Sequence, residues 1–292
     1  MNINEFNALI RLLDDSDPLV YNQVKNRFIK AGKDVLPLLR KEWNNQLTMQ
    51  EILKIEEIID AINFSDFNGN FKELLKENPD NILDAFLLLS KFYFPDINTT
   101  VILKQIDKIK KDIWLEMNFN LTALEKIRIF NHFFYDVHNF KVSFDFKVQN
   151  TFLNNILRYK TGNPISLSIL YAFFAQQSEL PVFGVNTGNK FLLAYLDSPI
   201  FSSVDIKKSR ILFFIDPASN QKLIDVPAVT TMLLDEKKIS EPNEIKPFRN
   251  MFFIRYWLTY TIVMFQKLGN QTKVKELQQI WKLFVEYAAS IN

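Results

Sequence analysis

The sequence predicts an α+β protein that is predominantly helical, in which one buried helix packs on a small antiparallel sheet between helical flanks. Apolar residues recur at helical spacing through most of residues 1–118 and 236–292. Residues 182–215, in contrast, contain three short apolar runs that are typical of strands. Directly before those runs, residues 164–177 are apolar on nearly every side, which indicates a helix inside a domain.

Residues 1–118 are expected to form a helical region, either HEAT-like or a plain helical bundle. Asp17 can cap a helix that has Pro18 in its first position, where a missing N–H costs nothing. A further helix pattern follows Gly32, so this part reads as a helix pair around an LDDxD turn, which resembles a HEAT-type repeat. The less regular patterns beyond residue 43 fit a bundle equally well, and neither alternative implies chemistry.

Residues 119–235 carry the expected core. Thr122 and Glu125 have the spacing of a capping box and predict a helix start. Asn163 followed by Pro164 predicts a second capped start, that of the buried helix. Three apolar runs follow this helix: residues 182–185, 191–196 and 211–215. Their spacing fits an antiparallel sheet packed on the helix.

Residues 236–292 are expected to form a C-terminal helical hairpin. Pro242 and Pro247 indicate a linker, which two helix patterns joined at Gly269 follow. The pair has a KLGN turn and resembles one tetratricopeptide-type unit. A single helix pair cannot build a solenoid groove, so we expect it to dock on the core.

The composition argues against several kinds of site. The chain has 0 cysteines, which excludes disulfides, a thiolate nucleophile and thiolate metal ligands in it. Only two histidines are present, His132 and His138, and they lie among aromatic residues, so we expect packing residues, no metal site and no cofactor. Six glycines leave little room for a glycine-rich phosphate loop. A net charge of +2 gives no general attraction to nucleic acid or to a membrane.

The sequence predicts a soluble, cytoplasmic protein. Residues 1–15 carry acids where a signal peptide has a basic start and an apolar core. The most apolar late stretch, residues 251–265, is interrupted by Arg255 and is too short to span a bilayer.

Three positions, in chain order, supply the frame of a site built from a nucleophile, a base and an acid. Ser166 lies at the start of the buried helix, where the helix dipole and free N–H groups favour negative charge. Lys190 begins the second apolar run and Asp216 ends the third. A base and an orienting acid on neighbouring strands are the other parts that such a site needs.

The sequence resembles the bacterial SirB-type transglutaminase-like family between about residues 121 and 225. Four short motifs carry the resemblance: GNPISL at 162–167, LPVFGV at 180–185, KFLL at 190–193 and IDP at 215–217. Segments 125–132 and 149–153 are also similar to the family. The resemblance implies a transglutaminase-like core, and the helical flanks resemble longer members that carry extra helices at both ends.

Two departures from the family pattern decide the functional expectation. The second-strand motif carries a histidine in the family, whereas GNKF at 188–191 places Lys190 there. Transglutaminase-like enzymes have a cysteine at the helix start, where this chain offers Pro164 or Ser166. Only Asp216 stands as the resemblance implies. A Cys-His-Asp mechanism is therefore impossible in this chain.

The leading hypothesis is a non-catalytic transglutaminase-like protein that binds a protein or peptide, at the former catalytic cleft or along the helical flanks. The alternative is an acyl transferase or amide hydrolase in which a neutral Lys190 takes the proton of Ser166. Asp216 opposes this, because a carboxylate favours the charged ammonium; a Lys190–Asp216 ion pair between strands is the simpler interpretation. A purely structural helical scaffold is the third hypothesis.

Overall fold

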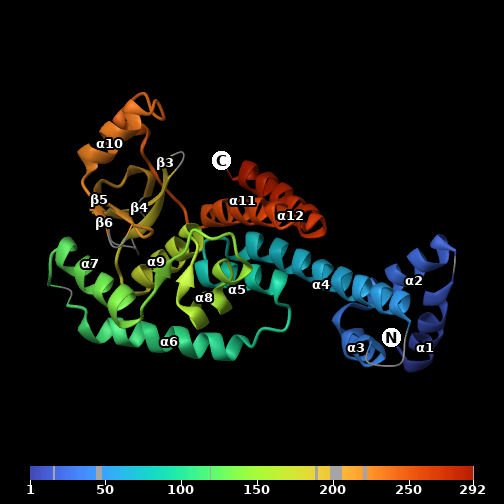
Figure 1. Ribbon diagram of the computed structural model, residues 1–292. Helices are drawn as coiled ribbons and strands as arrows, with labels where there is room; N and C mark the ends of the chain where they lie inside the picture. Colours follow the sequence, from blue (N-terminus) through green and yellow to red (C-terminus); the bar gives the residue numbers. More distant parts are fainter. Residues whose placement is uncertain are drawn as a thin grey trace. The chain divides into compact units, whose positions relative to one another are not determined.

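The computed structural model describes residues 1–15, 17–43, 48–118, 120–187, 190–197, 206–219 and 222–291 (Figure 1). The chain forms two compact units. The first consists of Met1–Leu74 and Lys91–Pro95, and the second of Leu75–Ser90 and Asp96–Asn292. Helices α4 (Met49–Glu77) and α5 (Ile82–Tyr93) each contribute residues to both units. The domain boundaries predicted at 118/119 and 235/236 stay predictions.

Helices build the first unit. It contains most of α4 together with α1 (Ile3–Arg11), α2 (Pro18–Ala31) and α3 (Leu36–Trp43), with 3-10 turns at Leu12–Asp14 and Gly32–Val35. Asp17 caps α2 by accepting a hydrogen bond from the N–H of Leu19, and Pro18 is the first residue of the helix, as predicted. The helix ends at Ala31, and the next residue, Gly32, has a φ of 69°, which suits glycine. Phe6 and Phe28 lie in the buried core of this unit.

The second unit holds the remaining helices around two sheets. They are most of α5, α6 (Thr99–Glu116), α7 (Ala123–Asn131), the π-helical turn η3 (His132–Val137), α8 (Leu153–Tyr159), α9 (Pro164–Gln177), α10 (Val226–Asp235), α11 (Phe252–Lys267) and α12 (Gln271–Ser290). Thr122 and Glu125 form the predicted capping box at the start of α7. Short 3-10 turns lie at Val148–Asn150, Ile206–Lys208 and Pro242–Glu244. No helix among the described residues is both long enough and apolar enough to cross a membrane.

The main sheet is antiparallel and has the strand order β6-β5-β4-β3-β7. Its strands are β3 (Val182–Thr187), β4 (Lys190–Leu196), β5 (Ile211–Asp216), β6 (Lys222–Ile224) and β7 (Pro247–Phe248). The first three are the strands that the sequence predicts. A separate parallel pair joins β1 (Lys141–Val142) to β2 (Thr161–Gly162). The fold class is therefore confirmed: a predominantly helical α+β protein with a small antiparallel sheet.

Both faces of the main sheet are covered. Phe214 of β5 packs with Val229 and Leu233 of α10 in one buried cluster. Leu193 and Ile215, which pair across β4 and β5 on the alternate face, are fully buried as well. Helix α9 contacts β3 and β4, and its residues from 166 to 175 are all buried. The expected buried helix is thus confirmed, and its position beneath the sheet fixes where its N-terminus lies.

Pro247 begins an edge strand, although the sequence indicated a linker there. Proline fits an edge strand because its missing N–H need not remove a ladder bond. The next residue, Phe248, lies opposite Gly184 of β3, and a Cβ at Gly184 would clash with the ring of Phe248. That ring also stacks on Tyr256 of α11, with ring centroids 5.4 Å apart. Glycine at position 184 therefore leaves room for the Phe248 ring against β3. This close approach places β7, and α11 directly after it, next to the sheet.

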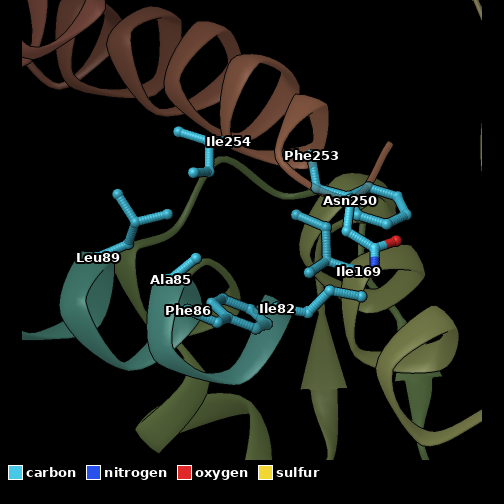
Figure 2. Close-up of a pocket in the computed structure, with 8 residues that line it drawn as sticks. All are labelled: Ile82, Ala85, Phe86, Leu89, Ile169, Asn250, Phe253 and Ile254. Atoms are coloured by element: carbon cyan, nitrogen blue, oxygen red, sulfur yellow. The ribbon is translucent and has the colours of Figure 1, made fainter. Parts of the chain in front are cut away.

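Helix α11 packs against α5 and α9 around a small apolar cavity of about 10 Å³ (Figure 2). Figure 2 shows its lining side chains: Ile82, Ala85, Phe86, Leu89, Ile169, Asn250, Phe253 and Ile254. The volume is close to the minimum that one water molecule needs, and Asn250 is the only amide in the lining. The cavity is therefore a packing defect between three helices rather than a ligand site.

Candidate functional site

The N-terminus of α9 is the place where the sequence predicts a nucleophile. Asn163 caps the helix, since its Oδ1 accepts a hydrogen bond of 2.9 Å from the N–H of Ser166. The backbone N–H of Asn163 donates to the carbonyl oxygen of Asn150 at 2.7 Å. The helix start is thereby tied to the 3-10 turn that precedes α8, and the predicted cap is confirmed.

Ser166 is fully buried and hydrogen-bonded. Its hydroxyl donates to the carbonyl oxygen of Thr151 at 2.8 Å and accepts from Nδ2 of Asn163 at 3.2 Å. The exposed fraction of Ser166 is 0%. The hydroxyl proton therefore points at a backbone carbonyl, which cannot act as a general base, and not at a titratable side chain.

Trp257 of α11 belongs to the same buried hydrogen-bond network. Its indole N–H donates to the carbonyl oxygen of Thr151 at 3.0 Å, so that this oxygen accepts two hydrogen bonds. The side chain of Thr151 is held as well, because its hydroxyl donates to the carbonyl oxygen of Lys147 at 3.2 Å and accepts from Nδ2 of Asn163 at 3.2 Å. Thr151, Asn163 and Ser166 are all 0% exposed and Trp257 is 1% exposed. Ser166 is therefore not accessible to a substrate in this structure.

Pro164 is the other candidate for the nucleophile position. It is the first residue of α9 and is partly exposed, whereas Ser166 is buried. A proline side chain offers no nucleophilic atom. The accessible residue of this turn therefore has no reactive group, and the residue with a hydroxyl is not accessible.

Asp216 is the last residue of β5, and its carboxylate accepts hydrogen bonds from the turn that follows. Its Oδ1 accepts from the N–H of Ala218 at 3.0 Å, and its Oδ2 accepts from the hydroxyl of Ser219 at 2.7 Å. The neighbouring Pro217 carbonyl accepts from the hydroxyl of Tyr135 at 3.0 Å. Among the described residues, no hydrogen bond joins Asp216 to Ser166.

Lys190 is the first residue of β4, and its backbone pairs with Thr187 of β3. The register of β4 against β5 aligns Leu193 with Ile215, so that Lys190 and Asp216 lie toward the same end of the sheet. The side chain of Lys190 and residues 188–189 are outside the described part of the chain. The ion pair with Asp216 and the base role of Lys190 both stay predictions.

Two tyrosines behind the site are held in the neutral form. Burial raises the pKa of Tyr171, whose hydroxyl donates to Oδ1 of Asn131 at 2.6 Å. Burial and the nearby carboxylate of Asp216 raise the pKa of Tyr135. Because both groups keep their protons at neutral pH, they can donate hydrogen bonds but cannot act as bases.

The two histidines differ from each other. The side chain of His132 is 61% exposed and pairs with Asp136 at 3.0 Å, so the expectation that it is a packing residue is wrong; the helix turns it to solvent. The side chain of His138 is only 10% exposed, with Nε2 3.5 Å from Oδ2 of Asp112. Burial and the charge of Lys160 lower the pKa of His138. Among the residues that the structure describes, no group of three or more acidic or histidine side chains could hold a metal ion.

The family model of the transglutaminase-like superfamily matches residues 100–258, which are 159 of the 292 residues. The chain therefore belongs to the transglutaminase-like superfamily. No curated protein matches it, and no solved structure does. The matched range begins in α6 and ends in α11, so it includes Trp257.

Sequence reasoning did not find Trp257 or Thr151 as parts of this site. Thr151 lies in the 149–153 segment that resembles the family, but no local pattern gives it a role. Trp257 is 106 residues away from Thr151 in the chain, and only the tertiary fold brings the two together.

Proposed function

We propose that this protein is a non-catalytic transglutaminase-like protein that acts by binding a protein or peptide. The observation that carries the proposal is the burial of Ser166, whose hydroxyl donates to the carbonyl oxygen of Thr151. The absence of cysteine from the chain supports it, because a thiolate nucleophile is excluded. We further propose that the protein is of the SirB type within the superfamily, and that its flanks are HEAT-like and tetratricopeptide-like. These finer assignments rest on the motif resemblance alone.

The alternative, an acyl transferase or amide hydrolase that uses Ser166 and Lys190, has less support. A serine nucleophile needs a base within hydrogen-bond reach and space for an acyl group. Ser166 instead donates to a carbonyl oxygen and is 0% exposed, which leaves no space for an acyl group.

A fluorophosphonate probe tests the proposal directly, because it labels serine hydroxyls that a base activates. We expect no labelling of the purified protein, while a serine hydrolase in the same assay reacts. Ser168→Ala is the matched control, since Ser168 is 1% exposed in the same helix and its hydroxyl donates to the Pro164 carbonyl at 2.7 Å. Labelling that persists in Ser168→Ala and disappears in Ser166→Ala would overturn the proposal.

A further inference from the structure

A polar groove lies at the C-terminal end of α9, within the second unit. It has a volume of about 290 Å³ and forms where α4 ends, α5 begins and α9 ends. Six polar side chains line it above an apolar floor of Ile82 and Phe173: Asn78, Asp80, Asn81, Gln176, Gln177 and Asn250. Five of the six are carboxamides. Figure 2 shows two residues of the groove, Ile82 and Asn250, which also line the neighbouring apolar cavity.

The single acid of the groove is already neutralised. Oδ2 of Asp80 accepts from Nε of Arg249 at 2.9 Å, and Oδ1 accepts from the N–H of Met251 at 3.0 Å. The side chain of Asp80 is 35% exposed. A cation or an anion would have to compete with this pair, so the groove suits a neutral ligand.

Two amides of the groove already pair as peptide groups do. Nδ2 of Asn250 donates to Oε1 of Gln176 at 2.8 Å, and Nε2 of Gln176 donates back to Oδ1 of Asn250 at 2.9 Å. Nε2 of Gln176 also donates to the carbonyl oxygen of Val182 at 2.8 Å. The hydrogen bond to Val182 anchors this reciprocal amide pair to β3, so the two side chains form one side of the groove.

Two other amides are left free. Asn78 and Gln177 are exposed, and within the part of the chain that the structure describes their side chains make no hydrogen bond. Each carboxamide offers two N–H donors and one carbonyl acceptor. That combination matches the N–H and C=O of a main-chain peptide group.

We propose that this groove binds an uncharged, extended peptide segment through its main chain, with Asn78 and Gln177 as the contacting amides. The inference rests on the proposed function and specifies its binding site. The apolar floor of Ile82 and Phe173 accommodates a small side chain between the peptide groups. A carbohydrate fits less well, because Phe173 is the only aromatic residue in the groove and is 6% exposed, which leaves no ring face for a sugar to stack on.

The groove is separate from the site at Ser166. Gln177 is the last residue of α9 and Ser166 lies in its first turn, so the helical rise separates them by about 16 Å along the axis. Peptide binding at Gln177 therefore does not need the hydroxyl of Ser166.

Nuclear magnetic resonance of the full chain with a blocked tetra-alanine, acetylated and amidated at its ends, tests the inference. The side-chain NH2 signals of Asn78 and Gln177, assigned with the variants Asn78→Ala and Gln177→Ala, should shift and saturate as the peptide is added. The same peptide with N-methylated main-chain amides and a C-terminal dimethylamide has no N–H donors and keeps only its carbonyl acceptors, so it should cause weaker shifts. Gln177→Ala should weaken binding about fivefold, which corresponds to roughly one net hydrogen bond. Gln279→Ala, at an exposed glutamine of α12, is the matched control and should bind like the unmodified chain.

Three results would overturn the inference. They are the absence of saturable shifts at Asn78 and Gln177, equal shifts with the N-methylated peptide, and preferential shifts of the same signals by maltose, which would indicate a carbohydrate site. None of them depends on Ser166. A failure here would leave the fluorophosphonate result intact, and labelling of Ser166 would overturn the non-catalytic proposal without affecting the groove.

Discussion

Trp257 and Ser166 donate hydrogen bonds to the same acceptor, the carbonyl oxygen of Thr151, at 3.0 and 2.8 Å. A carbonyl oxygen has two lone pairs, so this acceptor is fully used. The shared acceptor joins α11, the N-terminus of α9 and the turn before α8 into one buried polar network. The N-terminus of α9, where the sequence places the expected nucleophile, is therefore fixed by buried hydrogen bonds.

This hydrogen-bond network predicts that two substitutions of Trp257 lower the free energy of unfolding by different amounts. Trp257→Phe keeps most of the ring volume and removes one of the two donors to Thr151, so we expect a loss of about 1 kcal/mol in the free energy of unfolding. Trp257→Ala also leaves a cavity, and we expect a loss of about 3–5 kcal/mol. Urea unfolding measures both. Trp114→Phe is the control, because Trp114 is 61% exposed and the change should stay within about 0.5 kcal/mol. Equal effects of Trp257→Phe and Trp114→Phe would refute a structural role for the indole N–H.

Ser166→Cys gives the chain a single thiol at the predicted nucleophile position, because the sequence has 0 cysteines. We expect this thiol to react with a thiol reagent only when the protein unfolds, since Ser166 is 0% exposed. Its rate should be at least about 10³-fold below that of Gln279→Cys on the exposed face of α12, in line with the unfolded fraction of a stable domain. Circular dichroism checks that both variants are folded. A rate for Ser166→Cys close to that of the exposed thiol would show an open helix start.

The sequence predicted the parts of this site that depend on near neighbours. The cap of α9 joins Asn163 to Ser166, three residues apart, and the capping box of α7 joins Thr122 to Glu125 over the same spacing. The direction in which Ser166 faces could not be predicted, because α9 is apolar on every side and its periodicity selects no face. The hydrogen bond from Trp257 to Thr151 joins residues that lie 106 positions apart, and no local pattern encodes such a contact.

His138 predicts a loss of stability in mild acid. Its folded-state pKa is lowered, by burial first and then by the charge of Lys160, with Lys108 adding to the effect and Asp112 opposing it. Below the unfolded pKa of 6.5 the unfolded chain binds a proton that the folded chain does not, so the free energy of unfolding falls as pH falls from there to the folded pKa.

Urea unfolding at about pH 7.5 and about pH 5.5 measures this dependence. His138→Gln cannot be protonated and should lose less stability between the two pH values than the unmodified chain. His132→Gln is the control, because His132 is 61% exposed. If both variants keep the full pH dependence, other groups cause it and the assignment to His138 is wrong.

The close approach of Gly184 and Phe248 predicts strong coupling between the two positions. Gly184→Ala places a Cβ against the ring of Phe248, and we expect a loss of about 1–3 kcal/mol in the free energy of unfolding from overpacking. Phe248→Ala removes the ring that stacks on Tyr256 and should itself cost about 3–5 kcal/mol. In the Phe248→Ala background the added Cβ meets no ring, so Gly184→Ala should then be nearly neutral.

A double-mutant cycle by urea unfolding measures this coupling, which we expect to reach at least about 1 kcal/mol. Gly69→Ala is the matched control, because Gly69 lies inside α4 with no atom within 4 Å of an added Cβ, and the change should stabilise the helix by about 0.5–1 kcal/mol. Additive effects of Gly184→Ala and Phe248→Ala would mean that the ring does not rest on the glycine. Another interaction would then have to hold β7 against β3. The position of α11, from which Trp257 donates to Thr151, would also need another explanation.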